Sequence, residues 1–282
     1  MTRGSRHLLT NGQALAGMLI VLLFVSVALF APQLASHSPS RQNLTEDLRP
    51  PRAGHLFGQD KLGRDMFSRV VYGARVSLLV GVLVVGVAGT VGLIIGAVSG
   101  YAGGLVDELL MRLIDILLAF PGIVLAIGLS AVLGPSLRNS LLALSVIGWT
   151  GYARLVRGEV LGWREREFVT AAVALGAGPV RVVTRHVIPQ LLAPLVVQAT
   201  FGMAGAIVAE ASLSFLGLGV QPPTPSWGAM VNEGRSFLLV APHVALFPGL
   251  AMMLTVLGLN LLGDGLRDEL DVRTATRDQD YR

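Results

Sequence analysis

Long stretches of this chain consist of hydrophobic and small residues without a single charge. Asp, Glu, Lys and Arg are absent from 76–106, from 186–209 and from 242–263. A helix of about twenty apolar residues, rising about 1.5 Å per residue, crosses a hydrocarbon core about 30 Å thick. A soluble protein can bury one such helix but not several. The pattern therefore predicts an all-α, polytopic membrane protein.

Six transmembrane helices are expected. They are Ala14–Ala31, Val76–Ser99, Ile116–Leu133, Asn139–Ala153, Gln190–Ala209 and Val244–Gly263. The fourth is the shortest, because Arg138 and Arg154 flank it, so these arginines must snorkel or the bilayer must thin. The first follows Arg3 and Arg6 as a signal peptide would, but its apolar run is long and Ala35-Ser36-His37 is a poor cleavage site. We expect the first helix to be retained.

An even number of spans places both termini on one side of the membrane. The N-terminus, Gly100–Asp115, Arg154–Ile188 and the tail together carry 13 Arg and Lys, against 9 in the alternate loops, which favours cytoplasmic termini. Pro32–Arg75 and Glu210–His243 would then lie outside. We accordingly expect an N-terminal helix with its external loop at 1–75, a membrane core at 76–265 and a cytoplasmic tail at 266–282.

Composition agrees with a membrane protein and excludes other classes. Only 14% of the residues are charged, against about 25% in soluble domains. There is no cysteine, so neither a disulfide framework nor a thiolate site is expected. The pI of about 10.1 accompanies a net charge of only +4, which fits basic cytoplasmic loops better than binding to nucleic acid.

Catalytic and cofactor-binding patterns are not expected from this sequence. It contains no phosphate-binding GxxxxGK[ST] loop, no convincing Ser/His/Asp set and no metal-ligand spacing. Its histidines are scattered over loops, where we expect them at the membrane surface or in solvent: His7, His37, His55, His186 and His243. No catalytic residue, metal ligand or cofactor site is assigned, and the chain is not expected to be an enzyme.

Small residues recur at every fourth position in the second span. They are Ala88, Gly92, Gly96 and Gly100. This spacing places them on one face of a helix, where another backbone can approach closely. A high overall glycine content is the alternative explanation, since the chain has 34 glycines.

Residues 154–189 carry the pattern of a short amphipathic helix. Its apolar face is expected from positions spaced i, i+3, i+4 and i+7, namely Phe168, Ala171, Ala172 and Leu175. Glu167 stands near the positive end of the helix dipole, and Gly176 can end the helix in a left-handed conformation. An exposed apolar face beside a membrane is expected to pack against something. It packs either on the membrane surface or the helix bundle of the same chain, or against a second protein.

A second short helix is expected to start at Gly178-Pro179. Arg181 and Arg185 lie on one side of it, and three valines on another. Pro189 is expected to break this helix just before the fifth span.

This loop resembles the EAA loop of ATP-binding-cassette (ABC) importer permeases. The similarity runs through Thr170-Ala171-Ala172, three residues, Gly176, nine residues and His186-Val187-Ile188-Pro189. The family has Glu-Ala-Ala, three residues, Gly, nine residues and Ile-x-Leu-Pro. Thr170 stands in place of the acid, with Glu167 a possible substitute. The variants are similar to those of the dipeptide and oligopeptide branch.

Three further stretches are similar to the same branch and to its C-type subunit. They are Phe57 to Asp65 with Tyr72 to Leu78, Glu210 to Pro223 with Trp227-Gly228, and Asn260 to Asp268. Together with the loop, the resemblance covers residues 57–273. It implies a type I ABC importer permease fold in a bacterial cytoplasmic membrane.

The resemblance also implies partners and roles. The implied partners are a sister permease, two ATP-binding subunits and an extracytoplasmic substrate-binding protein, with the lipid bilayer around them. In the family the EAA loop is a coupling helix that sits in a groove of the ATPase. Here the residues expected to make this contact are Glu167, Phe168, Ala171, Ala172, Leu175, Gly176, Ala177, Arg181 and Arg185. The solute would be a dipeptide or oligopeptide, or else glutathione, a nickel chelate or haem.

The segment after Glu210 is expected to be irregular and external. Glycines and prolines interrupt any helix there, and irregular backbone at membrane depth survives only where protein or water satisfies it. Glu210, Ser212 and Ser214 are therefore candidates for the outer mouth of a solute path. The alternative is a structural lid in which Glu210 pairs with Arg235.

Two other classes of function are alternatives to an ABC permease. An ion-coupled carrier keeps ionisable residues within its spans, whereas here the acids and arginines fall at the span ends. A membrane enzyme or a static assembly subunit is disfavoured by the missing catalytic constellation. A requirement for a partner ATPase distinguishes the first class from the others.

Overall fold

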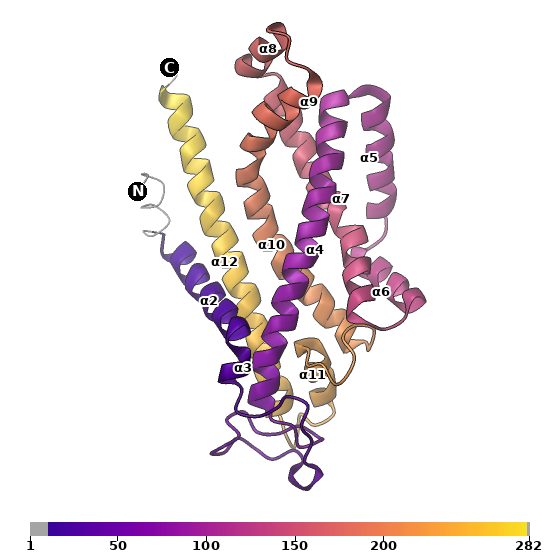
Figure 1. The fold of residues 1–282 in the computed structure, drawn as a ribbon, viewed down its shortest axis with the longest axis vertical. Helices are drawn as coiled ribbons and strands as arrows, with labels where there is room; N and C mark the ends of the chain where they lie inside the picture. The colour runs from indigo at the N-terminus through magenta and orange to yellow at the C-terminus, as the bar shows by residue number, and fades with distance from the viewer. Residues whose placement is uncertain (1–10, 281–282) are drawn as a thin grey trace.

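The computed structural model describes the backbone of residues 11–280 and the side-chain surroundings of residues 11–270. The chain forms an elongated bundle of long helices with loops gathered at one end (Figure 1). The described residues contain isolated bridges but no strand. The elements in order are α2 (Gly12–Leu29), α3 (Ala31–Leu34), η1 (Leu44–Glu46), α4 (Met66–Ala102), α5 (Gly104–Leu118), α6 (Gly122–Leu133), α7 (Leu137–Arg164), α8 (Glu167–Ala174), α9 (Pro179–Val182), η2 (Val183–Val187), α10 (Ile188–Phe215), α11 (Trp227–Arg235) and α12 (His243–Asp280).

Four continuous helical segments are long and apolar enough to cross a membrane. They are Gly12–Leu29, Met66–Ala102, Pro179–Phe215 and His243–Leu270, to which the bent pair α5 and α6 adds a fifth. The all-α architecture with several helices able to cross a membrane is therefore confirmed. The number six stays a prediction, because α7, which contains the expected fourth span, is not among these segments.

The expected third span, Ile116–Leu133, is not one continuous helix. It divides between the end of α5 and the whole of α6, whose axes differ by 81°. The break lies at Pro121, which has no N–H to donate and whose ring disfavours helical backbone at the preceding Phe120. The polarity pattern concealed this break, because both halves are apolar.

The expected fourth span, Asn139–Ala153, lies inside the longer α7. Ser136 caps the start of this helix by accepting a hydrogen bond from the Asn139 N–H at 3.1 Å. The helix continues beyond Arg154, whose guanidinium pairs with Asp115 of α5. Arg157 pairs with Asp107 of α5 at 2.5 and 2.6 Å. Both arginines are thus paired with acids of α5, Arg154 in an exposed pair and Arg157 in a partly buried one.

The expected fifth span also starts earlier, because Pro189 does not break the helix before it. α9, η2 and α10 run on as one segment, Pro179–Phe215. The η2 stretch has the wider π-helical turn, which accommodates a ring and a missing N–H that would disturb an α-helical turn. The second half of the amphipathic loop, from Pro179 onward, is therefore continuous with a helix long enough to cross a membrane.

α4 packs against α7 along the small-residue face predicted from the sequence. A Cβ atom added to Gly96 would lie 2.5 Å from the Ala153 carbonyl oxygen, and one added to Gly100 would lie 2.9 Å from Cβ of Val160. Real Cβ atoms do not approach other atoms so closely, so the two backbones touch only because side chains are absent there. The packing explanation of the spacing is confirmed, and glycine content alone does not account for it.

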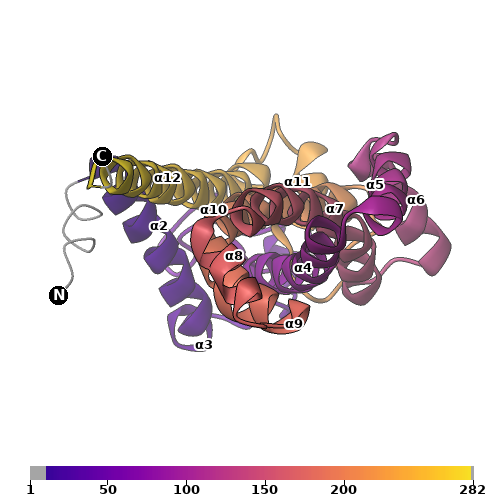
Figure 2. The same ribbon diagram turned by 90° about the horizontal axis from the view of Figure 1, so that it is seen from above.

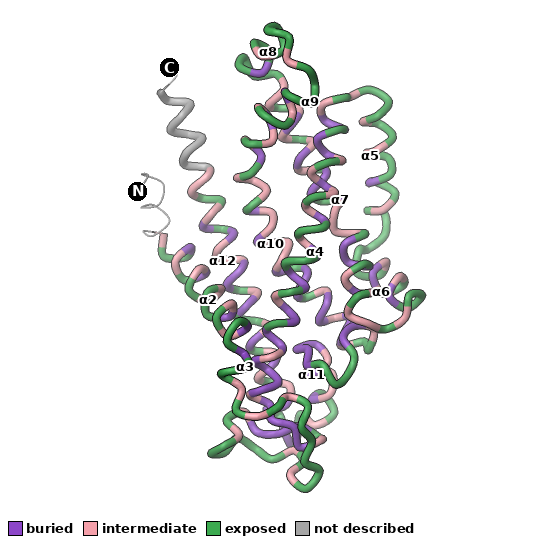
Figure 3. Tube along the Cα trace, in the orientation of Figure 1, coloured by how far each residue is buried: buried purple, intermediate pink, exposed green. Residues whose placement is uncertain are grey.

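The remaining helices pack around this pair. α10 contacts both α4 and α12, and α2 lies against α12, which places α2 and α12 on one flank and α5 and α6 on the other (Figure 2). Buried residues follow the centre of the bundle and the loop end, whereas α5, α6 and α8 are largely exposed (Figure 3). α8 and α9 lie at the end of the bundle opposite the loops. The start of α2 and the end of α12 point toward the α8 end.

Candidate functional site

α8 is held at the end of the bundle by one buried side chain. Val169 is 1% exposed and belongs to a core cluster with Val160 of α7, Val182 of α9 and Val187 of η2. The Phe168 ring contacts the Trp163 ring with centroids 6.1 Å apart, and the Arg166 guanidinium lies 5.6 Å from the Trp163 centroid. The helix is therefore fixed to the elements before and after it, and its other faces remain open.

Gly176 ends α8 in the conformation expected from the sequence. Its φ is +88°, in the left-handed region. The Ala177 N–H donates to the Ala172 carbonyl at 3.0 Å and the Gly176 N–H to the Val173 carbonyl at 2.9 Å, the paired bonds of a Schellman cap. This cap turns the chain sharply from α8 into α9.

The predicted contact residues form a mainly exposed apolar surface. Leu175 is 89% exposed and Phe168 is 43% exposed, and Val180 of α9 adds a side chain that is 76% exposed. Glu167, Ala171, Gly176, Arg181 and Arg185 are also exposed, while Ala172 and Ala177 are half-buried. Sequence reasoning missed Val169, the side chain on the opposite face that anchors the helix.

A cavity of about 280 Å³ opens between α4, α6, α7 and α10. Its lining is mostly apolar or small, with Val84, Ile123 and Gly202 among the residues. Two polar residues, Tyr152 and Gln198, also line it, and the Tyr152 hydroxyl donates to the Gln198 backbone carbonyl at 3.3 Å. Such a cavity can receive part of a solute or a helix of another subunit, and it contains no catalytic constellation.

Glu210 lies deeper than the sequence suggested. It is 1% exposed and accepts hydrogen bonds from Ser214 at 2.5 Å and Ser226 at 3.2 Å. It does not line the cavity. The alternative of a Glu210–Arg235 pair is wrong, because the Arg235 guanidinium lies over the Phe215 ring, 5.3 Å from its centroid. Ser214 is buried with Glu210, while Ser212 donates to the Val208 carbonyl in its own helix.

A buried charge cluster closes the loop end of the bundle. The Asp60 carboxylate accepts a hydrogen bond from Nε of Arg64 at 2.6 Å and lies 3.2 Å from Nη1 of Arg69. Glu233 of α11 contacts the same two guanidinium groups at 2.9 and 3.4 Å. Asp60, Arg64 and Arg69 are each at most 4% exposed. The cluster ties the 36–65 loop to α4 and α11, a role that the motif Gly58-Gln59-Asp60 did not reveal on its own.

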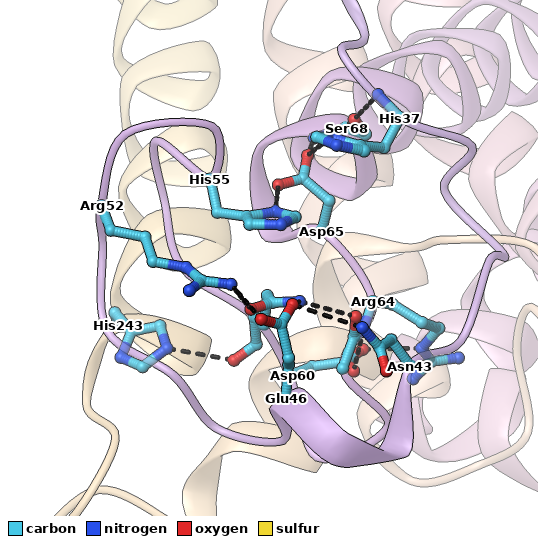
Figure 4. Close-up of polar contacts among 12 residues, drawn as sticks. His37, Asn43, Glu46, Arg52, His55, Asp60, Arg64, Asp65, Ser68 and His243 are labelled. Atoms are coloured by element: carbon cyan, nitrogen blue, oxygen red, sulfur yellow. Dashed lines mark hydrogen bonds and ion pairs between the residues drawn. The ribbon is translucent and has the colours of Figure 1, made fainter.

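Two further contacts, one partly exposed and one buried, continue this network (Figure 4). The Arg52 guanidinium lies 2.7 Å from the Glu46 carboxylate and, together with the hydrogen bond from Gln59, lowers the pKa of Glu46. His243 bonds the Gln59 carbonyl oxygen at 3.1 Å through Nε2. The loop is thus tied to the start of α12.

The expectation that the histidines are solvated is wrong for two of them. His243 is 7% exposed, and the His55 side chain is 16% exposed and bonds Asp65 at 2.8 Å. His37 and His186 are partly exposed, and His7 lies outside the described residues. The burial of these loop histidines was not predicted, because the 36–65 segment folds through contacts between residues that are far apart in the sequence.

Comparison with known proteins agrees with this architecture. Residues 92–276 match the family described as binding-protein-dependent transport system inner membrane component. Residues 3–51 match the N-terminal transmembrane domain of oligopeptide transport permease C.

Curated relatives cover nearly the whole chain. A dipeptide transport system permease protein of Alkalihalophilus pseudofirmus is 47% identical over 94% of this chain and 88% of the relative. A probable D,D-dipeptide transport system permease protein of Escherichia coli K12 is 44% identical, over 89% and 85%. A glutathione transport system permease protein of Escherichia coli O6:K15:H31 is 46% identical, over 92% and 86%. The chain is an inner-membrane, multi-pass protein and belongs to the family of binding-protein-dependent transport system inner membrane components.

Proposed function

We propose that this chain is one of two membrane-spanning subunits of an ABC importer for dipeptides or oligopeptides. A sister permease would complete the translocation path, two ATP-binding subunits would supply the energy, and an extracytoplasmic binding protein would deliver the solute. The chain itself performs no chemistry. Similarity to dipeptide permeases over most of the chain supports the choice of solute.

The observation that carries this proposal is the apolar surface of α8. An exposed Phe168 and an almost fully exposed Leu175 would be costly in water, at about 25 cal/mol for each Å² of apolar surface left uncovered. Covering them in a groove of an ATP-binding subunit removes that cost. Arg181 and Arg185, exposed on the neighbouring α9 and η2, would then meet acidic groups at the rim of the groove.

Movement of this surface can reach the membrane through a continuous helix and a packed side chain. α9 and η2 continue into α10 without interruption, and Val169 locks α8 onto α7 and η2. ATP-driven closure of the two ATPases would draw the two coupling helices together. α7 and α10 would tilt with them and alternate the path between inward and outward access.

We further propose six membrane crossings with cytoplasmic termini. The bent α5–α6 pair and α7 would be the third and fourth crossings. The Asp107–Arg157 and Asp115–Arg154 pairs would lie near the cytoplasmic surface, where paired charges are tolerated. The regions would then be 1–75 for the first helix and external loop, 76–265 for the permease core with its coupling loop at 154–189, and 266–282 for the cytoplasmic tail.

The translocation path would pass along the cavity between α4, α6, α7 and α10. The sister permease would cover its open side. Buried Glu210 and Ser214 would fix the outer end of α10 and Ser212 would lie at the mouth, so that this segment acts as an outer gate.

Reconstitution with and without partners tests this function. The chain alone in proteoliposomes should neither hydrolyse ATP nor accumulate a labelled dipeptide. Together with the sister permease, the ATP-binding subunits and loaded binding protein, it should do both. Accumulation by the chain alone, driven by an ion gradient, would contradict the proposal and indicate a secondary carrier.

Glutathione is the second candidate solute, because a glutathione permease is 46% identical to this chain. Competition in the reconstituted system separates the two. Unlabelled dipeptide should abolish uptake of labelled dipeptide, and glutathione should leave it unchanged. If glutathione competes more strongly than unlabelled dipeptide, the importer is assigned to glutathione.

A further inference from the structure

Two histidines and one aspartate meet at the loop end of the bundle, although 28 positions separate the first from the last (Figure 4). His37 follows α3, His55 lies in the external loop, and Asp65 caps α4. One ligand atom from each, an imidazole nitrogen or a carboxylate oxygen, lies within 4.8 Å of the others. We propose that these three side chains bind a divalent first-row cation of the zinc class.

The distances suit a small cation. Nδ1 of His55 lies 2.8 Å from one Asp65 oxygen and Nδ1 of His37 lies 3.9 Å from the other. With zinc–ligand bonds of about 2.0–2.2 Å, two ligand atoms of a tetrahedral site lie about 3.4 Å apart. The measured separations, each to a different oxygen of Asp65, lie on either side of this value, and one ligand atom from each residue lies within 4.8 Å of the others. The rings already stack, with centroids 4.6 Å apart.

The electrostatics of the cluster also point to a bound cation. The Asp65 side chain is 2% exposed, and its ion-pair partners in the described part of the chain are these two histidines, which are neutral unless protonated. Nδ1 of His37 is buried and has no hydrogen-bond partner, although it faces this carboxylate. A buried carboxylate and an orphaned ring nitrogen directed at the same point are both satisfied by one metal ion.

Hydrogen bonding alone explains only part of the arrangement. Asp65 accepts bonds from the Ser68 N–H at 2.8 Å and the Ser68 hydroxyl at 2.7 Å, which accounts for its role as a helix cap. A His55 N–H can donate to the remaining oxygen. Neither bond gives a partner to Nδ1 of His37. These second contacts would instead orient the carboxylate for a metal, as outer-shell hydrogen bonds do at zinc sites.

The donor set and exposure define the kind of site. Two imidazoles and one carboxylate favour zinc, nickel, cobalt or copper over magnesium or calcium, which prefer oxygen ligands alone. The His37 side chain is 35% exposed, which leaves a route for the ion and room for a water as fourth ligand. The bound ion would clip the 36–65 loop to the first turn of α4. This clip does not depend on which solute is transported.

Zinc titration of the full-length chain tests the site. The protein, purified without a polyhistidine tag and stripped with EDTA, should bind one zinc ion per chain in calorimetry, and zinc should raise its unfolding temperature. His37→Ala should weaken zinc binding by more than about tenfold, since loss of an outer-shell partner alone costs 10–100-fold. It should also remove the zinc-dependent shift and leave metal-free stability near that of the parent, because the His37 ring makes no hydrogen bond of its own.

Two further variants and one control complete the test. His55→Ala should behave like His37→Ala, and Asp65→Asn should lose the metal while keeping a residue that caps helices well. His186→Ala, at the α8 end, should bind zinc as the parent does. Absence of saturable, one-to-one binding in the parent, or unchanged binding by His37→Ala, would overturn the proposal. If the other two variants do not fold, His37→Ala decides the question by itself.

Discussion

Single positions of α4 decide how closely it approaches α7. Ala88, Gly92, Gly96 and Gly100 were predictable as a packing face because their spacing is short-range and repeats with the helix. The identity of the partner helix was not predictable, since several apolar helices could have supplied it. The structure assigns α7, with Ala153 and Val160 against the glycines.

Gly96→Leu should lower the stability of the protein by about 1–3 kcal/mol through overpacking. The side chain would have to occupy space taken by the Ala153 carbonyl and Val156. Val98→Leu, at a position that is 49% exposed, adds comparable bulk outside the contact and should be tolerated. Thermal unfolding in detergent compares the two, and equal melting temperatures would refute the close contact.

Asp60 holds two buried arginines, Arg64 and Arg69, at once. Asp60→Ala should therefore destabilise the protein by about 3–5 kcal/mol, as expected when one member of a buried charge cluster is removed. Glu46→Ala, which removes a more exposed carboxylate from the same loop, should cost less. Denaturation of both variants measures the difference. If Glu46→Ala is the more harmful change, the cluster is not what secures the loop.

Among the elements, α8 was located correctly but its neighbours were not. The face spacing and Gly176 predicted a short helix with a left-handed end, and α8 has both features. Pro189 predicted a helix break that is absent, because the π-helical turn Val183–Val187 before it accommodates the proline ring and its missing N–H. Pro121 could have revealed the α5–α6 bend, but the uniform hydrophobicity on both sides outweighed it.

Gly176, in the left-handed region at the end of α8, can be compared with Gly178, two residues later, which has an ordinary φ. Gly176→Ser forces a side chain into φ near +88°, at a cost of about 1–2 kcal/mol, and should loosen the cap. Gly178→Ser places the same residue at φ −70° as the N-cap of α9, where serine is favoured. Limited proteolysis should cut the 165–180 segment faster in the first variant only. Equal cutting would mean that the cap does not order the loop.

At the scale of the whole molecule, the sequence predicted the class of protein. It also predicted that the 36–65 loop and the α8–α9 segment lie at opposite ends of the helix bundle (Figure 1). Apolar runs and charge asymmetry are properties of composition, which a single sequence contains. The buried contacts of Glu233 with Arg64 and Arg69 join residues 169 and 164 positions apart, whereas Asp60 and Arg64 are only four positions apart. No local pattern encodes the long-range contacts, and the histidine cluster was missed for the same reason.

Membrane topology can be tested directly because the chain has no cysteine. Single cysteines at Ser40 and Thr224 should react with an impermeant thiol reagent added to intact cells. Cysteines at Thr170 and Thr276 should react only after the membrane is opened. Ser40, Thr170 and Thr224 are exposed, so reactivity reports the side of the membrane rather than burial. External labelling at Thr170 would invert the proposed orientation.

We propose above that α8 couples this chain to an ATPase. Leu175→Glu places a charge on the most exposed apolar position of that surface, where docking would bury it unpaired at a cost of several kcal/mol. Thr170→Glu puts the same charge on the same helix, at the position where the EAA pattern has an acid. Neither change touches a membrane-crossing helix, so insertion should be normal in both.

The decisive measurement is dipeptide uptake by proteoliposomes that contain the complete importer, with co-purification of the ATP-binding subunits recorded in parallel. Thr170→Glu should transport dipeptide and co-purify with the ATP-binding subunits as the parent does. Leu175→Glu should lose uptake, and the ATP-binding subunits should dissociate or no longer respond to loaded binding protein. If Leu175→Glu assembles and transports as well as the parent, α8 is ordinary surface and the coupling role assigned to it is wrong.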